Sequence, residues 1–313
     1  MPIRNSGARR LLLAFGCAAA VASTTATARP VSQPVFKAGI DLVNVSVTVT
    51  DRKGTLVADL TADDFEILED GQKQRITYFA VGDPAEGGPE MHLGLLLDVS
   101  DSMEEDLPFT KTAAVKFLNA LTDAVDVTVV DFDTEVRVAR FSQAEFARLI
   151  ERIRQKKVSG DTAIYDAVGV YLDGASGQPG RKIMLLYTDG GDTRSSMPLS
   201  ELMELLKASD ATVYVIGALE HQPQSARYPQ RNVMERIAEV TGGQAFFPTS
   251  VKQLDEIYQK VLAQIRAQYT LGYVSTNPKT DGAWRKVEIR VAKKDDRGLR
   301  TRTRKGYFAP RKP

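Results

Sequence analysis

The sequence predicts an α/β protein whose central part is a doubly wound, mostly parallel sheet, with β segments on both sides of it. From residue 91 onward, short and fully apolar runs alternate with amphipathic stretches of helical length, a pattern typical of buried parallel strands joined by helices. The apolar runs are 93–97, 127–130, 183–187 and 213–216. Helices are expected around 108–122, 143–155, 162–174, 199–208 and 232–241, with a last one at roughly 252–268.

One segment departs from the parallel pattern. Residues 136–141 alternate apolar and polar side chains and follow the strand 127–132 after only a few residues. A connection this short permits only an antiparallel hairpin. We therefore expect residues 136–141 to form an antiparallel edge strand.

The β segments lie in an N-terminal half-domain, residues 36–83, and a C-terminal half-domain, residues 269–310. Alternation of apolar and polar residues at 40–50 and 287–291 is typical of half-buried strands, and residues 301–308 have strand character too. Each flank has only about 45 residues, too few to hold a core alone without disulfides. We expect the two halves to pair into one small β-sandwich around the central domain, residues 91–268; separate packing of each flank is the alternative.

The first 28 residues are expected to be a secretory signal peptide. Arginines precede a short apolar run, and an Ala-Thr-Ala site at 26–28 ends the segment. The chain is therefore expected to be exported, to the periplasm or the extracellular space. The sole cysteine, Cys17, lies in this run, and acylation of Cys17 in a lipoprotein is the alternative. No later segment is long and apolar enough to span a membrane.

Charge and composition exclude several classes of function. The 41 basic residues balance 40 acidic ones, and no basic stripe with aromatic residues indicates nucleic-acid binding. The arginine cluster at 300–304 is interpreted as one face of an edge strand. The two histidines, His92 and His221, have no partner at metal-protease spacing, and phosphate-binding glycine loops are absent from the sequence. An enzyme is therefore not expected.

Oxygen-bearing side chains follow the first apolar strand of the central part. Asp98, Ser100 and Ser102 stand at alternate positions there, where ligands bind in open α/β sheets. Thr162 stands at the start of a helix, and Asp189 follows a later buried strand. Carboxylates and hydroxyls are hard ligands suited to Mg²⁺, Mn²⁺ or Ca²⁺. Capping of a helix start is the simpler interpretation of the Asp-Ser cluster alone.

Together these residues resemble a von Willebrand factor A domain with a complete metal-ion-dependent adhesion site. That site consists of D-x-S-x-S, a Thr on a second loop and an Asp in a T-D-G turn, and this sequence matches at each ligand position. The flanks also resemble exported bacterial proteins of this family, often acidobacterial. The flank motifs that carry this second likeness are Asp64-Phe65, Asp70-Gly71, Tyr269, Gly272, Tyr273, Gly306 and Tyr307.

The resemblance implies a Rossmann-like fold and a bound Mg²⁺ whose open position accepts an Asp or Glu from a partner protein. A structural scaffold, in which the metal only stabilises loops, and a metal-dependent hydrolase are the alternatives. The polar stretch 220–231 is expected to be a loop over the site, with Arg227, Tyr228 and Arg231 contacting the partner; a disordered insertion without a role is the alternative. Asp161 is interpreted as a loop residue and Asp192 as a holder of water beside the metal. Asp131 and Asp133 are expected to be solvated.

Overall fold

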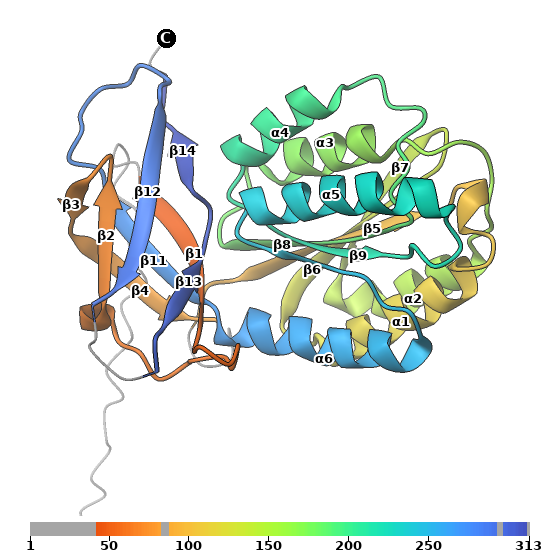
Figure 1. Ribbon diagram of the computed structural model, residues 1–313, viewed down its shortest axis with the longest axis horizontal. Helices are drawn as coiled ribbons and strands as arrows, with labels where there is room; N and C mark the ends of the chain where they lie inside the picture. Colours follow the sequence, from red (N-terminus) through yellow and green to blue (C-terminus); the bar gives the residue numbers. More distant parts are fainter. Residues whose placement is uncertain (1–41, 83–87, 293–296, 312–313) are drawn as a thin grey trace, which may run out of the picture. The chain divides into compact units, whose positions relative to one another are not determined.

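The computed structural model describes residues 42–82, 88–292 and 297–311 and contains three β-sheets (Figure 1). The expected signal peptide, Cys17 and part of the predicted linker at 82–89 lie outside the described residues. Within the described part of the chain, no helix is long and apolar enough to cross a membrane.

The central sheet has six strands in the order β10-β9-β8-β5-β6-β7. Neighbouring strands run parallel except β6 and β7, which pair antiparallel at the edge, as the short connection between them predicted. The strands are β5 (Met91–Asp98), β6 (Ala124–Phe132), β7 (Val136–Ser142), β8 (Arg181–Thr188), β9 (Thr212–Gly217) and β10 (Gln244–Phe246). The predicted Rossmann-like α/β fold is confirmed.

Helices cover both faces of this sheet, each over its own buried apolar cluster (Figure 1). One face carries α1 (Leu107–Ala120), α2 (Phe146–Gln155) and α6 (Val251–Ala267). The other carries α3 (Ile164–Ala175), α4 (Leu199–Ala208) and α5 (Gln224–Val240). Short 3₁₀ turns occur at η1 (Ala62–Asp64), η3 (Asp101–Met103) and η4 (Gln143–Glu145).

The two flanks pair with each other strand by strand. One antiparallel sheet has the order β13-β1-β11-β4 and the other the order β14-β12-β2-β3, so each mixes strands from both ends of the chain. The first contains β1 (Leu42–Thr50), β4 (Ile76–Val81), β11 (Tyr269–Val274) and β13 (Arg300–Arg302). The second contains β2 (Phe65–Glu69), β3 (Gln72–Gln74), β12 (Trp284–Val291) and β14 (Gly306–Phe308). One buried apolar cluster unites side chains of both sheets.

The flank motifs have structural roles in this sandwich. The carboxylate of Glu69, on β2, accepts hydrogen bonds from the hydroxyls of Tyr273 at 2.8 Å and Tyr307 at 2.9 Å, and all three residues are buried. The Tyr269 hydroxyl donates to the Val57 carbonyl at 2.9 Å. The bond between Tyr273 and Glu69 joins the two sheets, because the two residues belong to different ones.

The structure corrects one strand prediction. Residues 301–308 do not form a single strand: β13 pairs with β1 in one sheet, and β14 pairs with β12 in the other. Gly306 marks the change, because a Cβ there would lie 2.3 Å from the Arg285 carbonyl oxygen. The chain crosses between the sheets at the point where only glycine fits.

The strand that leads to the predicted site packs tightly around Gly94. A Cβ on Gly94 would lie 2.2 Å from the ring of Tyr171, a buried side chain of α3. Gly94→Ala is therefore expected to destabilise the fold by about 1–3 kcal/mol through overpacking. Gly174→Ala is the matched control, because it adds a methyl in open space on α3 and should stabilise by about 0.5–1 kcal/mol. Urea unfolding measures both changes; equal stability of the two variants would contradict this account of the packing.

Candidate functional site

The last residue of β5 is Asp98, and its side chain is wholly buried. The parallel register of β5 and β8 pairs Leu97 with Tyr187, so the ends of the two strands lie side by side. The Thr188 hydroxyl consequently donates to Asp98 Oδ2 at 2.6 Å. The other oxygen, Oδ1, accepts from the Ser100 hydroxyl at 2.6 Å and the Ser100 amide at 3.0 Å.

Ser102 and Asp189 join this network from either side. The hydroxyls of Ser100 and Ser102 are 3.1 Å apart, and the Ser102 hydroxyl also hydrogen-bonds the Asp189 carboxylate. Asp189 follows β8 directly and is 1% exposed. Gly190, with a φ of 90°, turns the chain after it, and a Cβ there would collide with Met234 on α5. Four of the five predicted ligands thus form one continuous network of oxygen atoms.

Thr162 reaches the same edge through backbone contacts and not through its side chain. The loop before it is tied to the Asp98–Ser102 loop, because Ser159 N donates to Val99 O at 2.8 Å and Asp101 N donates to Gly160 O at 3.0 Å. Its own amide donates to the Thr193 hydroxyl at 3.0 Å. Within the described residues the Thr162 hydroxyl has no hydrogen bond, so it can accept a ligand.

The electrostatics of the site are unusual, because two buried carboxylates lie together without a cation. Burial, and after it the negative charge of Asp189, raise the pKa of Asp98 to about 7 in spite of the hydrogen bonds from Ser100 and Thr188. Burial also raises the pKa of Asp189. Among the described residues neither carboxylate forms an ion pair with a basic side chain. Both therefore resist ionisation unless a positive charge is supplied.

This donor set fits a hard divalent cation. Two carboxylates and three hydroxyls offer only oxygen ligands, and two negative charges balance one divalent ion. Nowhere in the described part of the chain do three or more His, Cys, Asp or Glu side chains gather in a way that could hold a metal ion. A metal at this edge would therefore depend on the hydroxyls of Ser100, Ser102 and Thr162.

The neighbouring aspartates Asp131 and Asp133 are not solvated, as the sequence had suggested, but buried. The Asp131 carboxylate contacts Arg137 at 2.8 Å, Arg152 at 2.7 Å and Lys156 at 2.5 Å. Asp133 pairs with Arg137 at 2.6 Å. Hydrogen bonds from these cations outweigh the burial and lower the pKa of both carboxyls. Both carboxylates are therefore ionised, and the basic side chains around them balance their negative charge.

Two acidic residues near the site have local structural roles. Asp192 Oδ1 accepts from the Tyr165 amide at 3.2 Å, at the start of α3, and from the Ser195 hydroxyl at 2.6 Å. Asp161 is exposed in the loop before Thr162, as expected.

The stretch 220–231 is mostly helix, which corrects the prediction of an overhanging loop. α5 begins at Gln224, so Arg227, Tyr228 and Arg231 all lie on its first two turns. Tyr228 is 76% exposed. Arg227 instead donates to the Gln222 carbonyl at 2.9 Å, and Arg231 pairs with Glu235 at 3.0 Å beneath the Phe247 ring. Of the three side chains, that of Tyr228 is the most exposed, and Arg231 also faces solvent.

Three further residues that were not predicted contact the site or lie beside it. Thr188 hydrogen-bonds Asp98, and Gln222 donates from its amide to Asp189 Oδ2 at 2.6 Å. His221 lies between Asp106 at 3.0 Å and Glu105 at 3.1 Å. Thr188 could have been found from its place in the T-D-G turn, but Gln222 and His221 belong to no motif.

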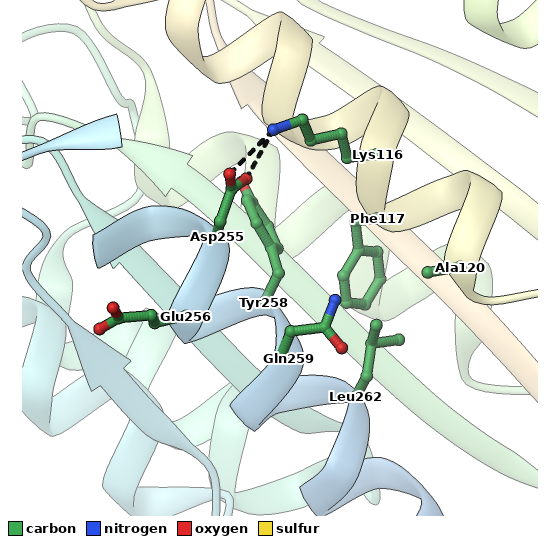
Figure 2. Close-up of a pocket in the computed structure, with 8 residues that line it drawn as sticks. All are labelled: Lys116, Phe117, Ala120, Asp255, Glu256, Tyr258, Gln259 and Leu262. Carbon is green, nitrogen blue, oxygen red and sulfur yellow. Dashed lines mark hydrogen bonds and ion pairs between the residues drawn. The ribbon is translucent and has the colours of Figure 1, made fainter. Parts of the chain in front are cut away.

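A separate groove of about 440 Å³ lies between α1 and α6 (Figure 2). Lys116 crosses it to Asp255 at 2.8 Å, and the rings of Phe117 and Tyr258 are 5.8 Å apart in it. None of the five predicted metal ligands lines this groove. It is not part of the sheet-edge site.

An α/β sheet with oxygen-bearing loops gathered at its carboxyl edge defines a class of ligand-binding domains. The family model of the von Willebrand factor type A domain matches residues 92–260, slightly more than half of the chain. The protein belongs to the von Willebrand factor type A domain family.

Individual relatives are distant. A UPF0353 protein of Mycolicibacterium paratuberculosis is 25% identical over 220 residues, 61% of this chain, and the chain spans only 63% of that relative. A von Willebrand factor type A protein from Catenulispora acidiphila has a TM-score of 0.49 at 15% identity, over 88% of this chain and 75% of its own. The PilB minor pilin of Streptococcus sanguinis has a TM-score of 0.48 at 16% identity, over 59% and 63%. These likenesses concern the fold alone.

The raised pKa of Asp98 makes the stability of the metal-free protein depend on pH. Between about pH 4 and pH 7 the folded chain keeps a proton that the unfolded chain releases, so folding weakens as the pH rises through this window. The loss attributable to Asp98 should be about 2–4 kcal/mol at pH 8.

Urea unfolding in EDTA at pH 4, 6 and 8 measures this dependence. Asp98→Asn should remove most of it, because the amide carries no charge to desolvate. Asp161→Asn, on an exposed loop, is the control and should follow the native chain. An Asp98→Asn variant that loses stability with pH as steeply as the native chain would refute this account of the site.

Proposed function

We propose that this protein is an exported, non-enzymatic binding module that captures an acidic residue of a partner protein through a divalent cation. Asp98, Ser100, Ser102, Thr162 and Asp189 would hold the cation, Mg²⁺ or otherwise Mn²⁺ or Ca²⁺, as a metal-ion-dependent adhesion site. Membership of the von Willebrand factor type A family supports this use of the sheet edge. The likeness of the flanks to exported bacterial proteins and the signal-like N-terminus support export.

One observation carries the proposal: among the residues that the structure describes, no basic side chain pairs with the buried carboxylates of Asp98 and Asp189. On the neighbouring strand β6, Asp131 is surrounded by three basic side chains. The same domain thus neutralises one buried aspartate internally and leaves the other two to an external positive charge. A bound divalent ion would supply that charge and attract a carboxylate from outside.

The hydroxyl ligands explain why a carboxylate is the expected guest. Ser100, Ser102 and Thr162 are neutral, so the five ligands together carry only the two negative charges of Asp98 and Asp189. Ser102 is exposed while Asp98 and Ser100 are buried, so the network opens to solvent on the Ser102 side. An incoming Asp or Glu would approach from that side and make charge-assisted contacts.

The scaffold alternative predicts a different effect of removing the metal. If the ion served only to stabilise loops, its removal would weaken the fold and not a partner complex. A hydrolase would need a general base beside the cation, and both ring nitrogens of His221 are already engaged, by Glu105 and by Asp106. The geometry therefore favours binding over catalysis.

The central test is capture of envelope and extracellular proteins by residues 29–313 in Mg²⁺ and in EDTA. We expect a partner that is retained in Mg²⁺ and lost in EDTA, and lost again in Asp98→Ala/Ser100→Ala, because both remove the positive charge. Asp161→Ala is the matched control: it removes an exposed acidic side chain beside Thr162 and should leave capture unchanged.

The thermal stability of the same proteins separates the alternatives. Capture that is indifferent to both EDTA and the double variant would refute the adhesion-site proposal. A fold that collapses in EDTA even at pH 5, where Asp98 keeps its proton and needs no cation, would support the scaffold.

Tyr228 is the partner contact that we retain from the predicted set. It is the large hydrophobic side chain that α5 exposes, six residues after Gln222, which touches the site. Tyr228→Ala should weaken capture by about tenfold or more if this ring anchors the partner, and it should leave the Mg²⁺ affinity unchanged. Calorimetry with Mg²⁺ and titration of the captured partner measure the two effects; a loss of Mg²⁺ affinity would show that Tyr228 acts through the site instead.

A further inference from the structure

The connection between β9 and α5 is fastened to the sheet edge at two points. We call this segment, residues 218–223, the strap. From the strap, His221 reaches the Asp106 carboxylate at 3.0 Å, and Gln222 reaches Asp189 Oδ2 at 2.6 Å. Arg227 braces it from α5, donating to the backbone carbonyls of Gln222 at 2.9 Å and Glu220 at 2.5 Å. The strap is therefore held so that one side chain meets a predicted metal ligand.

The contact with Gln222 limits what Asp189 can offer. The amide nitrogen can only donate, so it occupies one lone pair of Oδ2, and a cation that bound Asp189 through both oxygens would have to compete with it. Asp189 is almost completely buried, so water does not readily replace this hydrogen bond. Gln222 therefore favours binding of a cation through one oxygen of Asp189 over binding through both.

We propose that Gln222 is a positioning residue that makes the sheet-edge site select Mg²⁺ over Ca²⁺. This inference rests on the proposed metal site and adds its selectivity. Mg²⁺ takes six ligands in octahedral geometry, with one or two carboxylates and several waters. Ca²⁺ takes six to eight oxygens and gains from a carboxylate that binds through both oxygens. A site whose Asp189 offers a single oxygen suits the smaller ion.

The neutral charge of Gln222 acts in the same direction. A carboxylate at this position would be a third negative charge beside Asp98 and Asp189, and higher ligand charge strengthens Ca²⁺ binding. The brace from Arg227 matters because an unrestrained glutamine would have several rotamers to choose from. Arg227, expected from the sequence to contact a partner, thus acts inside the molecule.

The test compares the Mg²⁺ and Ca²⁺ affinities of residues 29–313 by calorimetry. Gln222→Met keeps the length of the side chain and removes the donor, which frees Asp189 Oδ2. The ratio of the Ca²⁺ to the Mg²⁺ dissociation constant should fall about tenfold, the lower end of what loss of a partner to a metal ligand does. Gln222→Glu should lower the ratio further. A ratio that stays within about twofold of the native value in Gln222→Met would overturn the inference.

Two arginines one helical turn apart supply matched controls. Arg227→Ala loosens the brace and should lower the ratio in the same direction, by less than Gln222→Met. Arg231→Ala removes an arginine that pairs with Glu235 and should leave the ratio unchanged. Equal effects of the two arginine variants would attribute the change to α5 as a whole and overturn the role of the strap. Far-ultraviolet circular dichroism in EDTA verifies that each variant folds.

The same titrations distinguish failure of this inference from failure of the proposed function. If the native chain binds neither cation, the proposed metal site falls and this inference falls with it. If the native chain binds Mg²⁺, Asp98→Ala does not, and Gln222→Met keeps the native ratio, only the role of Gln222 is refuted.

Discussion

The constraint on which the rest of this site depends is the burial of two carboxylates at the carboxyl edge of one sheet. Asp98 ends β5 and Asp189 follows β8, its parallel neighbour, so the register of the sheet alone brings them together. Removing one carboxylate from water is already costly, and a second one nearby adds repulsion. The surrounding hydroxyls and amides reduce this cost, but they carry no net charge. The negative charge of the two carboxylates is therefore not balanced by these neutral groups, and a bound cation would balance it.

Another buried aspartate of the same domain does have basic partners, so the lack of such partners among the described residues around Asp98 and Asp189 is a specific feature of their site. Asp131 is buried one strand away from Asp98, and three basic side chains converge on it. The loop that carries Thr162 begins at one of those cations, Lys156, and is tied to the Asp98–Ser102 loop by backbone hydrogen bonds. The ion pairs of Asp131 thus anchor the loop that carries Thr162. The anchored loop places the Thr162 hydroxyl, which has no hydrogen bond among the described residues, beside Asp98 and Asp189, the two carboxylates that lack a basic partner there.

The sequence was most informative where the physics is local. Apolar runs of strand length predicted the parallel sheet, and a connection of a few residues predicted its antiparallel edge, because both depend on neighbouring residues alone. Burial of Asp131 was missed because its partners lie 6, 21 and 25 residues further along. The start of α5 was missed because a polar stretch with two prolines resembles a loop. In the structure Pro223 precedes the first turn, where a missing amide hydrogen does no harm, and Pro229 is accommodated within the helix. The five ligand positions were predicted as a pattern; the hydrogen bond from Gln222 has no pattern to reveal it.

The corrected position of α5 changes how the site and its surface relate. Arg227 and Tyr228 are adjacent in sequence, but the helix points them to different environments: the arginine bonds to the carbonyls of the strap, and the tyrosine is exposed to solvent. In a loop these two residues could change position independently, whereas in a helix the hydrogen-bonded backbone keeps them in a fixed relative orientation. The same first turns therefore carry both the brace on a metal ligand and the most exposed aromatic ring nearby. A partner that pressed on Tyr228 would act on the segment that holds Gln222 against Asp189, so the proposed partner contact and the proposed cation site would be coupled through α5.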